Sequence, residues 1–345
     1  MKSRTTKRDK TQIKREKETK REEPEQTMRQ INTEHFQLPR RTVITLGKFD
    51  GLHLGHRKLI HTLQSCKKEE LDSVVFTFSV PPASIVQGTR SGQLMTGAER
   101  TAALEQAGID YLISYPCDQK LIHMSAENFI CEILVGKCQA AVIVVGTDCH
   151  FGYQRRGDVG MLRQYADQYD YQVVVVDKEI DPVSGEEISS TLIKRELLAG
   201  NMEHANAMLG YPYSYRGEVV HGKQLGRTLG IPTMNVYPDE EKIVPPAGVY
   251  CAKAEIDGCI YKGIANIGYK PTVTEEHRLL LETFLFDFHA DVYGKEIAVM
   301  LYFFVRAEQK FAGIPELQRQ MTADIRSGRE YFDRQTDVSD KGEET

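Results

Sequence analysis

Residues 43–56 read Val-Ile-Thr-Leu-Gly-Lys-Phe-Asp-Gly-Leu-His-Leu-Gly-His. The apolar start predicts a buried β-strand, and the glycine-rich remainder predicts a turn that leads into a helix. The free N–H groups and positive dipole of a helix start favour phosphate binding, and two imidazoles add donors for an oxyanion. We therefore interpret this stretch as a cradle for a nucleoside triphosphate, in preference to a loop that merely contains two histidines.

The size and composition of the chain are those of a globular protein with two domains. It has 345 residues, of which 41% are hydrophobic. Its longest apolar runs, such as 140–145, are too short to cross a bilayer, and its charged N-terminus lacks the apolar segment of a signal peptide. The seven cysteines are odd in number and include no Cys-x-x-Cys pair, which favours reduced thiols in a cytoplasmic protein over disulfides or a zinc site.

The net charge of −5 is unevenly distributed. Residues 1–22 contain ten Lys/Arg and four Asp/Glu, a net +6, and the other residues, with 34 basic and 45 acidic side chains, carry −11. The basic segment has almost no large apolar residues and cannot form a core. We expect residues 1–37 to form a disordered basic extension. RNA binding is the alternative, and it is disfavoured because residues 2–21 have no aromatic side chains to stack on bases.

Between about 41 and 181, short apolar runs alternate with helical patterns. Thr96 and Glu99 form a capping-box pattern at the second expected helix, and Ser125 is a candidate N-cap of the third. This alternation predicts a doubly wound, Rossmann-like α/β domain, whose ligands gather at the carboxyl ends of its parallel strands. The expected strands are 43–46, 74–78, 111–115, 141–145 and 173–176, and the expected helices are 56–67, 98–107, 126–135 and 157–169.

The pattern of the sequence changes after Gly210. Before that point, a turn at 181–185 and two helices, 188–200 and 203–209, follow the first set of strands. Beyond it, alternating segments with frequent Gly and Pro predict a compact antiparallel β-barrel, closed by an amphipathic helix at 314–325. The strands expected in the barrel are 213–220, 249–256, 260–267, 281–288 and 297–305.

Two further motifs of the first half suit a nucleotide. Gly146 and Asp148 follow the fourth strand, where a glycine and a carboxylate fit contact with a ribose; a turn with a solvated Asp is the alternative. Ser189, Ser190 and Thr191 stand together at a helix start, where hydroxyl groups can cap the helix and bind phosphate. Capping alone explains one of these hydroxyls more easily than all three.

The second half carries a glycine-rich segment, 221–235, with three glycines and two cations. Such a loop can cover ATP phosphates, although it lacks the spacing of a Walker loop. Thr233 and Asn235 offer neutral oxygens that suit a Mg²⁺ ion held mainly by phosphates; a simple glycine-rich hairpin is the alternative. Glu282 lies among apolar strand residues, where it can be a general base or a buried structural carboxylate.

These motifs together resemble those of bacterial bifunctional FAD synthetases, which join an FMN adenylyltransferase of the HxGH nucleotidyltransferase type to a riboflavin kinase. The resemblance covers about 38–331. The matching motifs of the first half are Gly-x-Phe-Asp-Gly-x-His-x-Gly-His, Phe-x-Phe at 76–78, Val-Val-Gly-x-Asp at 144–148 and Ile-Ser-Ser-Thr at 188–191. Those of the second half are Gly-x-Pro-Thr-x-Asn at 230–235, Pro-Pro-Ala-Gly-Val-Tyr at 245–250 and Gly-Ile-Ala-Asn-Ile-Gly-Tyr-Lys-Pro-Thr at 263–272.

The resemblance implies a domain organisation and two reactions. Residues 38–188 would be the FMN adenylyltransferase domain, 189–210 connecting helices, 211–335 the riboflavin kinase domain and 336–345 a disordered tail. The kinase would convert riboflavin and MgATP to FMN and ADP, and the adenylyltransferase would convert FMN and MgATP to FAD and pyrophosphate. The expected partners are these small molecules, with Mg²⁺ as cofactor and without membrane or nucleic acid.

The resemblance also implies site residues. His53 and His56 would be catalytic in adenylyl transfer, and Glu282 in phosphorylation. The residues that would bind ATP in the first domain are Gly47, Phe49, Asp50, Gly51, His53, Gly55, His56, Gly146, Asp148, Ser189, Ser190, Thr191 and Lys194. Those that would bind ATP in the second are Gly222, Lys223, Gly226, Arg227, Gly230, Pro232, Thr233 and Asn235, with Mg²⁺ at Thr233 and Asn235. Those that would contact flavin are Phe78, Asn266, Gly268, Glu282 and Arg306. An ion pair with Glu308 is the alternative for Arg306.

Four positions of the first half depart from the family pattern, and in the second half Phe284 stands where His is expected. Lys48, Cys149, His150 and Lys194 stand where Asn, Phe, Arg and Arg are common. They leave open a monofunctional riboflavin kinase with a degenerate first domain. A flavin-sensing RNA-binding regulator and a different nucleotidyltransferase are further alternatives, the last of which leaves the second half unexplained.

Overall fold

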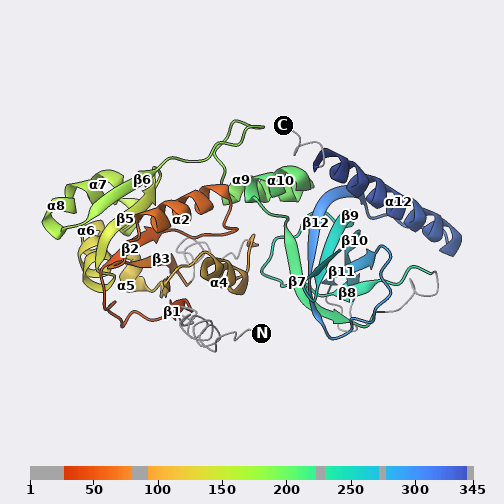
Figure 1. Cartoon of the computed structure of the whole chain (residues 1–345), viewed down its shortest axis with the longest axis horizontal. Coiled ribbons are helices and arrows are strands. Elements are labelled where there is room, and N and C mark those ends of the chain that lie inside the picture. Colours follow the sequence, from red (N-terminus) through yellow and green to blue (C-terminus); the bar gives the residue numbers. More distant parts are fainter. Residues whose placement is uncertain (1–26, 80–91, 223–229, 272–276, 340–345) are drawn as a thin grey trace, which may run out of the picture.

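The computed structural model describes residues 27–79, 92–222, 230–271 and 277–339. They form a parallel-sheet part and a barrel part, which lie side by side in Figure 1. Two helices, α9 (Ser190–Ala199) and α10 (Met202–Leu209), connect the parts. Ser189 caps α9, and α9 and α10 end at Gly200 and Gly210 in the left-handed conformation that glycine adopts at helix ends.

The first part is built on a six-stranded sheet with strand order β1-β4-β3-β2-β5-β6. All of its neighbouring pairs are parallel. Alternate residues such as Val74 and Val75 enter separate apolar cores on the two faces, which confirms the doubly wound α/β prediction. The strands are β1 (Arg29–Ile31), β2 (Thr42–Leu46), β3 (Asp72–Phe78), β4 (Tyr111–Tyr115), β5 (Ala140–Gly146) and β6 (Gln172–Val176).

Helices cover both faces of this sheet. Leu63 and Leu104 lie in one core, and Ile130 and Leu162 lie in the other. These side chains come from α2, α4, η1 and α7, in that order. The elements are α2 (Leu54–Cys66), α4 (Gly97–Gln106), α5 (Gln119–Ile122), α6 (Ala126–Asn128), the π-helix η1 (Phe129–Lys137), the 3-10 helix η2 (Tyr153–Arg155), α7 (Val159–Gln164) and α8 (Ala166–Tyr169).

The predicted helix starts at Thr96 and Ser125 are confirmed. The Thr96 side chain accepts from the Glu99 N–H in a complete capping box, and Ser125 caps α6. The helix predicted over 126–135 widens into a π-helix after its first turn, and the Cys138 N–H reaches a carbonyl five residues back. The helix predicted over 157–169 is divided into α7 and α8.

The strand β1 corrects the prediction that residues 1–37 are disordered. Residues 29–31 pair in parallel with β4, and the Arg29 N–H donates to the Asp110 carbonyl at 2.8 Å. Met28 is buried in a core of the sheet part. A strand of three residues is too short for its periodicity to be recognised, but the open edge of β4 supplies its hydrogen bonds. Residues 1–26 of the predicted extension lie outside the described residues.

The second part is a closed antiparallel barrel, as predicted, with strand order β10-β11-β8-β7-β12-β9. The side chains of Tyr250, Ala252 and Leu281 point into its interior core. The short strand β8 carries the Asn of the Gly-x-Pro-Thr-x-Asn motif. The strands are β7 (Ser214–Val220), β8 (Met234–Val236), β9 (Gly248–Ile256), β10 (Cys259–Pro271), β11 (His277–Leu285) and β12 (Glu296–Ala307).

A long C-terminal helix, α12 (Ile314–Ser339), packs on the outside of the barrel. It is longer than the predicted 314–325 and extends into the predicted tail as far as Ser339. Tyr331 and Phe332 extend its packing against Val249 and Phe286 of the barrel. Residues 340–345 lie outside the described residues. No helix in the described ranges is long and apolar enough to cross a membrane.

Candidate active sites

The turn between β2 and α2 has an uncommon backbone. Phe49, Gly51 and Leu52 have φ angles of 50°, 85° and 38°, a region that residues other than glycine rarely adopt. Phe49 is fully buried, and a Cβ on Gly47 would lie 2.9 Å from its ring. The packed ring holds the turn in this shape. It leaves His53 at the N-cap of α2 and His56 in the first turn of that helix.

The two histidines of the motif stack on each other. The ring centroids of His53 and His56 lie 3.8 Å apart. Burial lowers the pKa of His53 to about 4 and lowers the pKa of His56 well below its usual value. Among the described residues, neither Nδ1 atom has a hydrogen-bond partner, although both atoms are buried. The pair therefore presents neutral rings whose buried polar atoms can be satisfied by phosphate oxygens.

Asp50 is buried at the centre of the same turn. One carboxylate oxygen accepts from the Leu94 N–H at 2.8 Å, and the other lies 2.7 Å from Lys194 Nζ. Its carbonyl accepts from the Ser190 hydroxyl at 2.8 Å. Asp50 and Lys194, both expected to bind ATP, thus form an ion pair that ties the turn to α9. The Ser190 hydrogen bond and the Lys194 ion pair therefore join the turn directly to this helix.

Further cations surround Asp50, and sequence reasoning missed one of them. Arg100 of α4 donates to the Lys48 carbonyl at 3.4 Å, and its Nε is buried without a hydrogen-bond partner in the described parts of the chain. Burial lowers the pKa of both Lys48 and Arg100, and both side chains interact with Asp50. Three cations in all, Lys48, Arg100 and Lys194, therefore share one carboxylate, an arrangement that attracts a further anion. The sequence held one signal for Arg100: this cation lies near the N-terminus of α4, where the helix dipole disfavours positive charge.

The other expected residues of this site meet at one edge of the sheet. β2 and β5 are parallel neighbours, so the histidine turn and Gly146 lie at adjacent strand ends. Asp148 is exposed and pairs with Lys178 at 3.0 Å. Ser189 caps α9 and Ser190 donates to the Asp50 carbonyl, so two of the three hydroxyls form bonds within the protein. The third residue, Thr191, is exposed. Phe78 ends β3, on the other side of β2.

The expected kinase residues form a row across the barrel. Glu282 of β11 lies directly opposite Asn235 of β8 on one side and Asn266 of β10 on the other. Their strand neighbours Met234, Leu281 and Ala265 enter the interior core, so the row lies on the outer face of the barrel. Opposite residues of antiparallel strands are close enough to act together.

Asn235 is the most buried member of this row. Its Oδ1 has no hydrogen-bond partner among the described residues. Gly222 packs against it so closely that a Cβ there would lie 2.4 Å from Asn235 Nδ2. Gly230 has the positive φ of 73° that favours glycine. Lys223, Gly226 and Arg227 lie outside the described residues.

In the barrel part, the expected flavin residues other than Glu282 contact neighbouring side chains. Arg306 forms a two-bond ion pair with Asp324 of α12, at 2.9 and 2.6 Å, which replaces the alternative pair with Glu308. Glu308 instead accepts from Asn266 Nδ2 at 3.4 Å. A Cβ on Gly268 would lie 2.3 Å from the same carboxylate. The Glu308 side chain therefore covers the Asn266 end of the kinase row.

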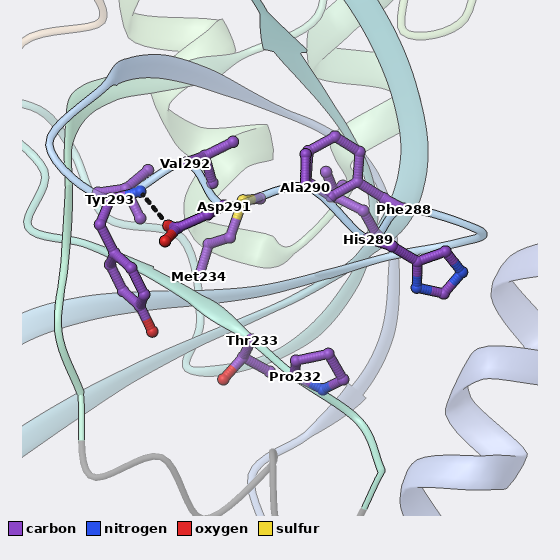
Figure 2. Close-up of a pocket in the computed structure, with 11 residues that line it drawn as sticks. Pro232, Thr233, Met234, Phe288, His289, Ala290, Asp291, Val292 and Tyr293 are labelled. Atoms are coloured by element: carbon purple, nitrogen blue, oxygen red, sulfur yellow. Dashed lines mark hydrogen bonds between the residues drawn. The ribbon is translucent and has the colours of Figure 1, made fainter.

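A cavity of about 380 Å³ opens beside Thr233, and Figure 2 shows its walls. The segment 288–293, which sequence reasoning did not single out, forms much of it. Tyr293 stacks on His221 with ring centroids 3.7 Å apart, and its N–H donates to Asp291 at 3.1 Å. Its walls combine apolar side chains with polar groups such as Thr233, His289 and Asp291, a mixture that suits a small-molecule site. The lining residues are Val219, Pro232, Thr233, Met234, Leu285, Phe288, His289, Ala290, Asp291, Val292 and Tyr293.

Known proteins match both parts of the chain. Residues 35–192 match the family model for FAD synthetase, and residues 209–332 match that for riboflavin kinase. The chain is 34% identical to the bifunctional riboflavin kinase/FMN adenylyltransferase of Listeria monocytogenes, over 84% of this chain and 92% of that protein. It is 36% identical to the protein of the same name from Escherichia coli K12, with the same coverage.

A solved structure from Streptococcus pneumoniae, described as a macrolide-efflux protein, is 30% identical. It aligns with a TM-score of 0.78 over 88% of this chain and 99% of its own. The two matched family models, one over the parallel sheet and one over the barrel, define a two-domain transferase that uses nucleotides. The chain belongs to the family of bifunctional riboflavin kinase/FMN adenylyltransferases, enzymes of flavin cofactor biosynthesis, as the sequence predicts.

Proposed function

We propose that adenylyl transfer takes place at the His53–His56 turn and phosphorylation at the Glu282 row. Residues 38–188 would carry the first reaction and 211–335 the second, with 189–210 between them. The observation that carries the proposal is the stacked, neutral histidine pair, whose buried Nδ1 atoms have no partner among the described residues. Such atoms fit a site that is completed by a polar ligand.

In adenylyl transfer, a phosphate oxygen of FMN would attack the α-phosphorus of ATP in line. The new P–O bond forms as the bond to pyrophosphate breaks, so no covalent enzyme intermediate is needed. His53 and His56 would donate to phosphate oxygens, and Lys48 and Arg100 would offset their charge. Gly55 lets the phosphates approach, because a Cβ there would lie 3.3 Å from His53 Nδ1. The hydroxyl of the exposed Thr191 remains available as a further donor.

In phosphorylation, Glu282 would take the proton from the 5′-hydroxyl of riboflavin as its oxygen attacks the γ-phosphorus of ATP, and ADP would leave. The cavity beside Thr233 would hold the adenosine. This is supported by its mixture of apolar and polar walls and by its place next to the Gly-x-Pro-Thr-x-Asn motif.

Mg²⁺ fits the kinase residues, and we propose it as the cofactor. The buried Asn235 Oδ1, without a partner in the described structure, is a neutral oxygen of the kind this ion accepts. The described residues contain no cluster of three His, Cys, Asp or Glu side chains that could hold a metal, which favours an ion bound mostly by phosphates. Mg²⁺ bound with ATP would offset the phosphate charge.

All seven cysteines are free, which supports the proposed cytoplasmic location.

The proposal is tested by incubating the protein with MgATP and either riboflavin or FMN and separating the flavins. Riboflavin should give FMN and FAD. Glu282→Gln should stop FMN formation and leave FAD formation from FMN, whereas His53→Ala with His56→Ala should do the reverse. The matched controls are Glu255→Gln on β9 and His61→Ala on the exposed side of α2, which should leave both reactions intact.

FMN without FAD from the unmodified protein would reduce the function to that of a riboflavin kinase. Neither product would contradict both assignments. EDTA should stop both reactions, and activity that persists in EDTA would contradict the Mg²⁺ proposal.

A further inference from the structure

We propose that the barrel part holds the histidine turn in its working shape, with Tyr211 and Lys242 as positioning residues for adenylyl transfer. The proposal rests on the assignment of that reaction to the His53–His56 turn. It concerns a set of bonds in which residues at or within the barrel reach the turn or the segment that supports it. These bonds join parts of the chain more than 140 positions apart.

Tyr211 joins the cores of both parts. Its ring packs against both the barrel core and a core of the sheet part. Its hydroxyl donates to the Gly51 carbonyl at 2.5 Å, two residues before His53. Burial raises the pKa of Tyr211, so the hydroxyl keeps the proton that it donates. Arg57 lies 5.2 Å over the ring and also donates to the Leu52 carbonyl at 3.2 Å. Tyr211 therefore contacts the turn itself.

Lys242 crosses between the parts in the segment that follows β8. Its ammonium lies 2.9 and 2.8 Å from the two carboxylate oxygens of Glu99, the residue that completes the capping box of α4. The Lys242 side chain is 4% exposed, and its ammonium lies 4.9 Å over the ring of Tyr213. A buried ion pair with two hydrogen bonds fixes the distance between α4 and the segment after β8, because separating it would leave two uncompensated charges.

Backbone hydrogen bonds connect the segment around Lys242 to the histidine turn. The Gln93 N–H donates to the Glu241 carbonyl at 2.6 Å, and the Ile243 N–H donates to the Gln93 carbonyl at 2.8 Å. The next residue, Leu94, donates its N–H to Asp50 and packs into the barrel core. A Cβ on Gly51 would lie 2.8 Å from the Leu94 side chain, so Leu94 packs directly against the turn.

The barrel side of the link is itself firmly held. The hydroxyls of Tyr213 and Tyr215 both donate to the Ile243 carbonyl, at 2.8 and 2.7 Å. The same segment begins directly after β8, which carries Asn235 of the kinase row. A strained turn with three positive φ angles persists only where its surroundings determine it, and here part of those surroundings is the barrel.

The test uses the full chain with Tyr211→Phe, which removes one hydroxyl and keeps the ring. We expect kcat/KM for FAD formation from FMN to fall about three- to tenfold, the usual worth of one hydrogen bond, with most of the loss in kcat. FMN formation from riboflavin should stay unchanged. The matched control is Tyr171→Phe, because the Tyr171 hydroxyl donates to the Leu162 carbonyl at 2.6 Å in the same sheet part.

A second variant, Lys242→Met with Glu99→Gln, removes both charges of the pair without leaving one unpaired. It should also lower FAD formation and spare FMN formation. If Tyr211→Phe affects FAD formation no more than Tyr171→Phe at an equal change in Tm, the positioning role is overturned. If the unmodified protein forms no FAD, the proposed function fails as well. FAD formation that is normal in both the unmodified protein and the two variants overturns the positioning role alone.

Discussion

His53 and His56 stack face to face at the start of α2, with both rings neutral because burial lowers their pKa values. The pair thus combines the proposed phosphate site with a cost in stability. Neutral buried imidazoles cannot take up the protons that the same side chains accept once they are exposed to water.

We predict that this pair makes the protein less stable in mild acid. The pKa of His53 is about 4 in the folded protein and about 6.5 when exposed. Between these values the unfolded chain binds more protons, so the free energy of unfolding falls as the pH falls from about 6.5 to about 4. One histidine with this shift contributes up to about 3 kcal/mol. Urea unfolding at a series of pH values measures the slope.

The matched variants isolate the cause of that slope. His53→Gln with His56→Gln should flatten the dependence below pH 6.5, whereas His61→Gln, an exposed change on the same helix, should leave it. Equal slopes in the double variant and the unmodified protein would contradict the prediction.

A second prediction concerns the ion pair between Lys194 and Asp50. The Asp50 carboxylate is 1% exposed, so Lys194→Met would leave a buried charge without its closest partner. We expect the free energy of unfolding to fall by about 3 kcal/mol, because breaking a buried pair on one side is strongly destabilising. Lys58→Met is the control, since Lys58 of α2 and Glu179, in the segment between β6 and α9, form an exposed pair with the same 2.7 Å separation. That change should cost less than about 1 kcal/mol, and equal losses would contradict the prediction.

The sequence predicted the elements whose signals are local. β4 matches its predicted range, because a run of apolar residues ends at Tyr115 in a change of composition. α4 and α9 begin where Thr96 and Ser189 provide caps. The turns and hydroxyl groups around the two histidines were also recognisable, because the chemistry of phosphate binding demands particular residue types at a helix start.

What depends on distant partners was missed. β1 exists because β4 has an open edge, and α12 continues beyond 325 because Tyr331 and Phe332 pack on the barrel. Arg100 reaches the histidine turn from a helix that begins more than 40 positions later. Likewise, the segment 288–293 becomes part of a cavity only when the barrel closes beside Thr233. None of these contacts leaves a periodic mark in the sequence.

We predict that Arg100 takes part in binding a phosphate during FAD formation. Its Nε is buried and has no partner in the described ranges, and its guanidinium can form charge-assisted bonds to phosphate. Arg100→Met should raise KM for ATP or FMN about tenfold in FAD formation and leave FMN formation unchanged. Arg163→Met, an exposed change on α7, is the control. Unchanged KM values for both substrates would exclude the role.

The last prediction concerns His204, which ties α10 to the segment before α9. Its Nε2 lies 2.9 Å from Asp181, and its Nδ1 lies 3.3 Å from Glu196. Burial lowers the pKa of His204, but hydrogen bonds to the two carboxylates outweigh burial and raise it overall. The stabilisation is therefore complete below the exposed value of about 6.5 and is lost as the pH rises through the folded value.

His204→Gln keeps a polar side chain but cannot be protonated. We expect the unmodified protein to lose about 1 kcal/mol of stability between pH 6.5 and 9 that the variant does not lose, measured by urea unfolding at matched pH. His123→Gln, a change at an exposed histidine, should keep the loss. Parallel curves for His204→Gln and the unmodified protein would show that the two carboxylates do not hold a charged imidazole, because only a protonated ring gives stability this direction of pH dependence.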